Sequence, residues 1–418
     1  MRSYPRYITI VITSLFIGIL TNLGHPVTPY LVKARGFIEY SFSIFFSVMS
    51  LGMLIFAPLW GSFGDKYGRR IVLLICSIGY SIGQVFFGFL DNIYLVICAR
   101  FFSGCFSAGL MVSVISFLDT SRGLKGFDMK RLIPMVLSFN LVGSSLGSYI
   151  GGVLGDTLGG NLNSYQWVLY IQAISLSIFG LILFFFFRLT DEELYNENQK
   201  RSNFIKNIKN VSKIGLWSII FLICLTLFNV VFTNMQRYLD YYYADIGKTS
   251  SELGLFNLII GIATLITNIL ITPILLKKLK SIVSIILFAI LGTISIVITF
   301  AINKDYLIYM IYTVLMVYIM SKAIIESGSV SFIQENIKIA PGLIMGVRQS
   351  FMSLGAVVGP LAGGAIYYSL PVDERRILFF ICALLYLLAA IILFGIYILR
   401  NRFKSNPLGG DIFCESVD

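Results

Sequence analysis

The chain has 418 residues, of which 57% are hydrophobic and only 13% are charged. Soluble domains carry about 25% charged residues, so this composition excludes an ordinary soluble protein and predicts a polytopic membrane protein built from helices. The net charge of +11 would also suit nucleic-acid binding, but the positions of the basic residues favour membrane orientation instead.

Twelve apolar runs approach or exceed the roughly 20 residues needed to cross a bilayer. We expect spans at 7–31, 40–60, 71–90, 93–117, 133–156, 166–187, 215–236, 252–276, 282–302, 305–330, 349–369 and 377–399. The longest polar interruption separates six spans from six. The expected domains are an N-terminal six-helix bundle (1–187), a cytoplasmic central loop (188–213), a C-terminal six-helix bundle (214–400) and a cytoplasmic tail (401–418).

The distribution of Lys and Arg predicts that both termini are cytoplasmic. With that topology, 23 of the 32 basic residues lie in cytoplasmic segments and 7 in outer loops, Arg237 among the latter. This is a strong positive-inside bias. The basic excess therefore serves orientation in the cell membrane, and nucleic acid is not expected as a partner.

Polar groups interrupt the first and seventh spans. They are Asn22 and His25, and then Asn229, Asn234 and Gln236. His25 is the only histidine, and near a span end we favour a hydrogen-bonded structural role over a proton relay. Asp240 is placed just beyond the outer end of span seven.

The segment GSFGDKYGRR (61–70) joins spans two and three. Its basic residues suit cytoplasmic orientation, but orientation explains neither the acid nor the glycines. Glycine allows a tight turn, and Asp65 can face a helix N-terminus, such as that of span eleven. We predict a cytoplasmic latch between the two halves. Its residues are Gly61, Asp65, Lys66, Gly68, Arg69, Arg70 and Asp119.

Three charges fall inside spans, where each costs roughly 2.5–3.5 kcal/mol on the insertion scale. Arg100 lies in span four, and Lys322 and Glu326 lie one helical turn apart in span ten. Lys322 and Glu326 either form a neutralising ion pair, or Glu326 exchanges protons or binds a cationic substrate. Arg100 either bonds backbone carbonyls, holds an anionic group or influences a proton site. With spans one and seven, these groups are expected to line one central cavity.

Spans five and eleven repeat each other. SFNLVGSSLGSYIGG and SFMSLGAVVGPLAGG stand 212 residues apart, and six of their fifteen positions are identical. Such a parallel repeat is a transporter architecture. Glycines every four residues leave one helix face without side chains, either for static packing or as a surface on which the halves rock. These residues are Gly143, Gly147, Gly151, Gly355, Gly359 and Gly363, with Pro360 expected to loosen its helix.

The chain resembles the major facilitator superfamily across all twelve spans. GSFGDKYGRR is similar to the motif that the family carries between spans two and three, and RFFSGCFSAG, with Arg100 and Gly104, to its span-four arginine motif. GSSLGSYIGG resembles the span-five motif of the antiporter branches, with Ser148 in place of proline, and Gly359-Pro360 in span eleven is intact. The pattern is most like the twelve-span drug:proton antiporters, the multidrug and tetracycline exporters.

The resemblance implies a secondary transporter that works by alternating access, with proton-coupled export of small amphipathic molecules as its activity. The alternative is a dedicated transporter of one metabolite, such as a sugar, a siderophore or a lipid precursor. No nucleotide-binding loop and no His/Cys metal cluster occurs in the sequence, so neither an enzyme, nor a cofactor, nor a metal is expected. The expected partners are the substrate, protons and the lipid bilayer, and a monomer suffices.

Overall fold

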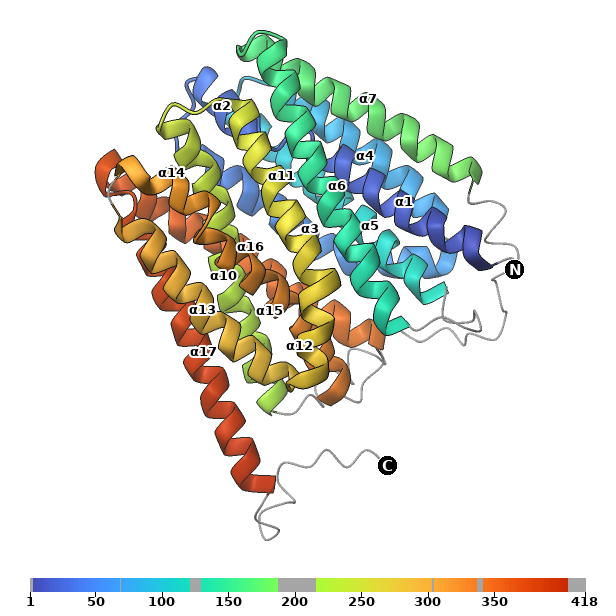
Figure 1. The fold of residues 1–418 in the computed structure, drawn as a ribbon. Coiled ribbons are helices and arrows are strands. Elements are labelled where there is room, and N and C mark those ends of the chain that lie inside the picture. Colours follow the sequence, from blue (N-terminus) through green and yellow to red (C-terminus); the bar gives the residue numbers. More distant parts are fainter. Residues whose placement is uncertain are drawn as a thin grey trace.

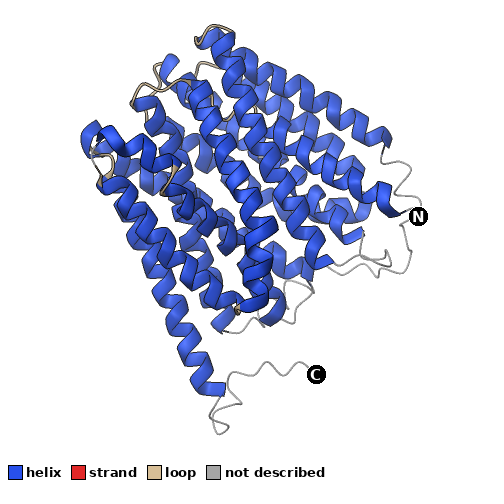
Figure 2. Cartoon of the chain, in the orientation of Figure 1, coloured by secondary structure: helices blue, strands red, loops and turns tan. Residues whose placement is uncertain are grey.

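The computed structural model describes residues 3–67, 69–120, 129–186, 216–302, 304–336 and 341–404. In these ranges the chain is helical and contains no strand (Figure 2), which confirms the all-α prediction. The first half contains α1 (Ser3–Asn22), α2 (Thr28–Ala34), α3 (Ser41–Tyr67), α4 (Arg69–Phe89), α5 (Ile93–Thr120), α6 (Met129–Thr157) and α7 (Leu162–Phe186).

The second half contains α10 (Leu216–Asp245), α11 (Ser250–Ile266), a π-helical turn η2 (Thr267–Ile271), α12 (Thr272–Lys278), α13 (Ser281–Ala301), α14 (Lys304–Tyr312), α15 (Leu315–Asn336), α16 (Pro341–Ser369), a 3₁₀ turn η3 (Val372–Glu374) and α17 (Ile377–Lys404). Each predicted span coincides with one helix or with consecutive helices. Nine helices of the described chain are long and apolar enough to cross a membrane. Shorter apolar stretches lie at Val11–Asn22 and Ser41–Ala57, so twelve crossings stay a prediction.

Span one ends earlier than expected. Helix α1 stops at Asn22, and residues 23–27 turn before α2 begins. Pro26 explains the break, because proline lacks an N–H donor and disfavours helical geometry in the residue before it. His25 therefore sits in this turn and not in a continuous helix.

Span seven ends later than expected. Helix α10 continues past 236 to Asp245, so the placement of Arg237 in an outer loop was wrong, and Asp240 lies inside the helix. The reason is a run of buried aromatic side chains between these polar residues, because a tyrosine ring supplies apolar surface when its hydroxyl finds a partner. Tyr238 illustrates this, since its hydroxyl lies 2.6 Å from Ser43 Oγ and donates to the carbonyl of Pro360.

The main contacts between the first and second halves join α6 to α11 and α3 to α16. Figure 1 shows the teal α6 and the yellow α11 side by side, with α1, α4 and α7 of the first half beyond α6. Helix α16 is not interrupted at Pro360. The π-helical turn η2 ends at Ile271, two residues before Pro273 in α12, where the proline supplies no backbone donor to the preceding turn.

The two glycine rows pack helices within each half. A Cβ on Gly147 would collide with the carbonyl oxygen of Ile19 on α1, and Gly143 and Gly151 face α1 in the same way. The second row, Gly355, Gly359 and Gly363, faces α10.

Different glycines line the contact between the halves. A Cβ on Gly254 of α11 would meet the backbone of α6, and one on Gly364 of α16 would meet Ser43 on α3. Gly152 and Gly261 also lie on the α6–α11 contact. The predicted rows therefore serve close packing, and any movement of one half against the other would use these other glycines.

Candidate functional site

A cavity of about 120 Å³ lies at the centre of the protein between the two halves. It is lined from α1, the 23–27 turn, α6, α10, α11 and α15. Its polar lining consists of Asn22, His25, Ser144, Ser145, Ser148, Gln236, Asp240, Asn257, Thr264, Lys322 and Glu326. Five of the eight predicted cavity residues thus meet here: Asn22, His25, Gln236, Lys322 and Glu326.

A second cavity of about 70 Å³ adjoins the first and shares Asn22 and His25 with it. We call it the arginine cavity, because Arg100 from α5 and Arg237 from α10 line it together with the side chains of Phe46, Tyr80, Gln84 and Gln172. The predicted single cavity is therefore two adjoining ones, with span four contributing to the smaller.

Asp240, His25 and Arg237 form a buried cluster between the two cavities. His25 Nε2 lies 3.4 Å from Asp240 Oδ2 and accepts a hydrogen bond from Arg237 Nη1. An arginine has no acceptor, so this bond requires an unprotonated Nε2 on His25. Asp240 is 2% exposed, and its Oδ2 accepts no hydrogen bond from any described residue. The hydrogen-bonded role predicted for His25 fits this geometry.

Lys322 and Glu326 both face the central cavity but do not pair with each other. No ion pair within 4.0 Å joins them among the described residues. The ammonium of Lys322 instead lies 5.6 Å from the centre of the Phe232 ring, a cation–π contact. The neutralising ion pair is therefore not the explanation of these two charges, and the Glu326 side chain, half-buried, remains directed to the cavity.

The two remaining predicted residues lie away from the cavity linings. Asn229 donates to the carbonyl of Met352 on α16, which ties α10 to α16. Asn234 is buried and lies against Gly363, and its Oδ1 has no hydrogen-bond donor among the described residues. These positions indicate structural roles.

The predicted cytoplasmic latch lies where α3 ends and α4 begins, with Asp119 in the last turn of α5. Gly68 and the side chains of Gly61, Asp65, Lys66, Arg69 and Asp119 lie outside the described residues. The guanidinium of Arg70 is 5.5 Å from the centre of the Phe184 ring. The latch stays a prediction.

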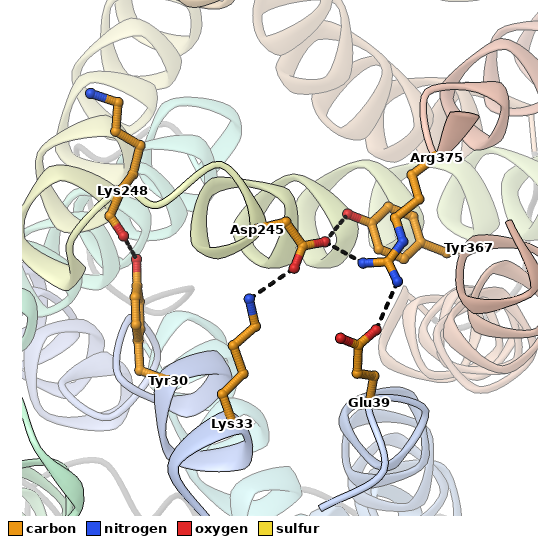
Figure 3. Close-up of polar contacts among 7 residues, drawn as sticks. All are labelled: Tyr30, Lys33, Glu39, Asp245, Lys248, Tyr367 and Arg375. Atoms are coloured by element: carbon orange, nitrogen blue, oxygen red, sulfur yellow. Dashed lines mark hydrogen bonds and ion pairs between the residues drawn. The ribbon is translucent and has the colours of Figure 1, made fainter. Parts of the chain in front are cut away.

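The opposite end of the molecule, extracellular in the predicted orientation, is closed by contacts between the halves (Figure 3). Asp245, at the end of α10, pairs with a basic residue from each half. Its Oδ1 lies 2.8 Å from Lys33 Nζ, and its Oδ2 lies 2.5 Å from Arg375 Nη1. Arg375 also pairs with Glu39 at 2.8 Å, and Tyr30 donates to the carbonyl of Lys248 at 2.7 Å. We call these contacts the outer network.

Arg375 stays charged in the outer network. Burial lowers the pKa of Arg375, but the hydrogen bond and charge of Asp245 outweigh it, so the pKa is raised above its usual range. A second contact between the halves joins α6 to the start of α11. Asp156 of α6 accepts hydrogen bonds from Ser250 Oγ (2.6 Å) and from the backbone N–H of Ser251 (2.8 Å). A carboxylate is favoured at the start of α11 because the helix N-terminus carries partial positive charge.

Sequence reasoning missed Arg237, Asp240 and Asn257 as site residues. The first two were missed because the predicted span ended at 236, whereas α10 continues to Asp245. Counting the tyrosines of YLDYYYAD as apolar would have extended the predicted span to include them. Asn257 gave no signal, because a single asparagine in an apolar helix is common, and only the rotation of α11 turns it to the cavity.

Comparison with known proteins finds relatives whose sequences match part of the chain and solved structures that match most of it. Multidrug resistance protein 1 of Bacillus subtilis is 26% identical over 119 residues, which cover 28% of this chain and 31% of that protein. Tetracycline resistance protein, class B, of Escherichia coli is 26% identical over 212 residues, 47% of this chain and 51% of that protein. The chain thus matches only about a third to a half of these relatives.

Two solved transporters share the fold. The nucleoside transporter NupG (D323A mutant) has a TM-score of 0.67 at 15% identity, covering 94% of this chain and 98% of that one. The human organic anion transporter MFSD10 (TETRAN) has a TM-score of 0.61 at 16% identity, covering 94% and 100%. The family model of the Major Facilitator Superfamily matches residues 10–341. The chain therefore belongs to the Major Facilitator Superfamily.

Proposed function

We propose that the protein exports small amphipathic molecules in exchange for protons by alternating access. The observation that carries the proposal is the central cavity, which both halves line and which holds Asp240, Lys322 and Glu326 from helices of the second half, while the outer network closes one end. An ionisable group within a membrane span is a functional-site candidate by default. The similarity to multidrug and tetracycline resistance proteins supports export.

Two bundles, 1–187 and 214–400, would rock against each other about this cavity, with the cytoplasmic loop 188–213 linking them and 401–418 as a cytoplasmic tail. With the outer network closed, substrate would enter from the cytoplasm. Opening the outer network would then release it outside, and the protein would return with a proton. A monomer in the cell membrane, with both termini cytoplasmic, suffices for this cycle.

Glu326 is the proposed proton carrier. It faces the central cavity and has no ion-pair partner within 4.0 Å among the described residues. A carboxylate without an ion-pair partner can gain and lose a proton as the cavity changes sides. Arg348 lies beside Glu326, but its printed hydrogen bond goes to the backbone carbonyl of Glu326 and not to the carboxylate. Asp240 instead lies 3.4 Å from His25 beside Arg237, and would fix the charge of that cluster.

The test is transport in proteoliposomes with imposed pH and voltage gradients, against a panel of dyes, antibiotics and metabolites. Glu326→Gln should abolish accumulation driven by the pH gradient and keep exchange of substrate between the two sides. Glu374→Gln, which removes an exposed carboxylate from η3, should behave as the wild type. Undiminished pH-driven transport in Glu326→Gln would remove Glu326 from the mechanism. A single metabolite as the only transported compound would favour the dedicated transporter.

A further inference from the structure

The arginine cavity holds two positive charges, and no carboxylate of the described residues pairs directly with either. Arg100 is 5% exposed and lies within the apolar stretch Ile93–Leu110. Its guanidinium carbon is 3.4 Å from the centre of the Phe87 ring. Among the described residues, no carboxylate oxygen lies within 4.0 Å of Arg100, and its buried Nε has no hydrogen-bond acceptor. A buried charge without such partners is costly.

Arg237 brings a second guanidinium to the same cavity. Both guanidinium carbons lie near one ring, 5.9 Å from the centre of Phe46 for Arg100 and 3.7 Å for Arg237. Arg237 has no carboxylate oxygen within 4.0 Å in the described chain. Its hydrogen bond goes to neutral His25, which adds no negative charge. Two like charges that converge on one cavity repel each other unless an anion lies between them.

The residues that line the two cavities carry a net positive charge. The cations are Arg100, Arg237 and Lys322, and the carboxylates are Asp240 and Glu326. Protonation of Glu326, as proposed above, would leave three cations against one carboxylate. The two cavities together therefore keep an excess of positive charge, which an anionic group of the substrate would neutralise.

We propose that the arginine cavity binds a carboxylate group of the transported molecule, with the apolar body of that molecule in the central cavity. A guanidinium matches a carboxylate with two parallel hydrogen bonds. A carboxylate group is small enough for the cavity of about 70 Å³. The shared residues Asn22 and His25 place the two cavities next to each other. The inference rests on the proposed transport function, and names the substrate class of the same site.

Three probes of similar size and different charge test it: benzoate, benzamide and benzylammonium. Binding is measured by equilibrium dialysis on the purified protein in detergent, without any gradient, at up to about 10 mM probe, which reaches millimolar affinity. Benzoate should bind at least about tenfold more tightly than benzamide, since hydrogen bonds to charged groups contribute roughly 1.5–3 kcal/mol. Benzylammonium should bind most weakly.

Arg100→Gln and Arg237→Gln should each weaken benzoate binding about tenfold or more and leave benzamide within about twofold. Arg100→Lys keeps the charge without the planar fork, and should retain a reduced preference for benzoate. Lys278→Gln, which removes an exposed cation from α12, should change nothing.

Equal affinities for the three probes, as expected of a cavity that takes only water, would overturn the proposal. So would benzoate that fails to bind, or arginine variants that weaken all three probes alike. The binding assay contains no gradient, so its result does not depend on whether transport is coupled to protons. If the transport assay showed pH-driven transport of cations alone, the carboxylate inference would be wrong and the proposed proton coupling would remain.

Discussion

Asp240 sets the charge beside the two arginines. It stands one helical turn after Arg237 on α10, and its carboxylate lies 3.4 Å from His25 Nε2. Because no described donor reaches Asp240 Oδ2, an amide in its place breaks no hydrogen bond there. Asparagine therefore removes the charge and keeps the shape.

Asp240→Asn should strengthen benzoate binding and weaken benzylammonium binding, each by about three- to tenfold. Unit charges ~8 Å apart interact by about 2 kcal/mol at an effective dielectric constant of ~20, and water in the cavity reduces this. Isothermal titration calorimetry of the purified protein measures both affinities. Asp91→Asn is the control, because that carboxylate pairs with Arg35 at 3.5 Å and is largely exposed. Weaker benzoate binding in Asp240→Asn would contradict the charge assignment.

The α1–α6 pair depends on backbone contact along its glycine row. Gly147→Ala would drive a methyl group into the carbonyl of Ile19, and overpacking of this kind costs roughly 1–3 kcal/mol. We expect a lower apparent melting temperature for the purified protein. Gly395→Ala in α17 is the matched control, since a Cβ there meets nothing within 4 Å and alanine favours the helix by about 1 kcal/mol. Equal melting temperatures for the two variants would refute the packing role of Gly147.

Helices were predictable where apolar residues run without interruption, as in α13 and α17, because crossing a bilayer demands such a run. Boundaries failed where local chemistry competes with hydropathy: Pro26 ends α1 early, and the tyrosines around Asp240 carry α10 onward. The direction of a side chain was not predictable at all. Arg100 and Arg237 face one cavity because distant helices fix how α5 and α10 rotate, and no local pattern records that.

At the scale of the whole molecule, the outer network links the two halves at one end of the described structure. The outer network joins α2 and the following loop to α10 and the 370–376 segment (Figure 3). Its members are distant in sequence, with Glu39 and Arg375 in opposite halves, so their pairing was not predictable from the chain. Since alternating access requires this end to open, the strength of the network should set how often it does.

Asp245→Asn should shift the protein toward the outward-open state, because the amide cannot pair with Lys33 and Arg375 as a carboxylate does. A loss of about 1–2 kcal/mol would raise the open population roughly 5- to 30-fold. The measure is the labelling rate of Gln236→Cys, which lines the central cavity, by a membrane-impermeant maleimide added outside, in a background without native cysteines. The control is Lys248→Gln, which breaks the 2.8 Å pair with Glu252 within the second half. It keeps the backbone carbonyl that accepts from Tyr30, so it should leave the rate unchanged. If Asp245→Asn also left it unchanged, the outer network would not hold this end closed, and the contact of Asp156 with α11 would be the closure to test next.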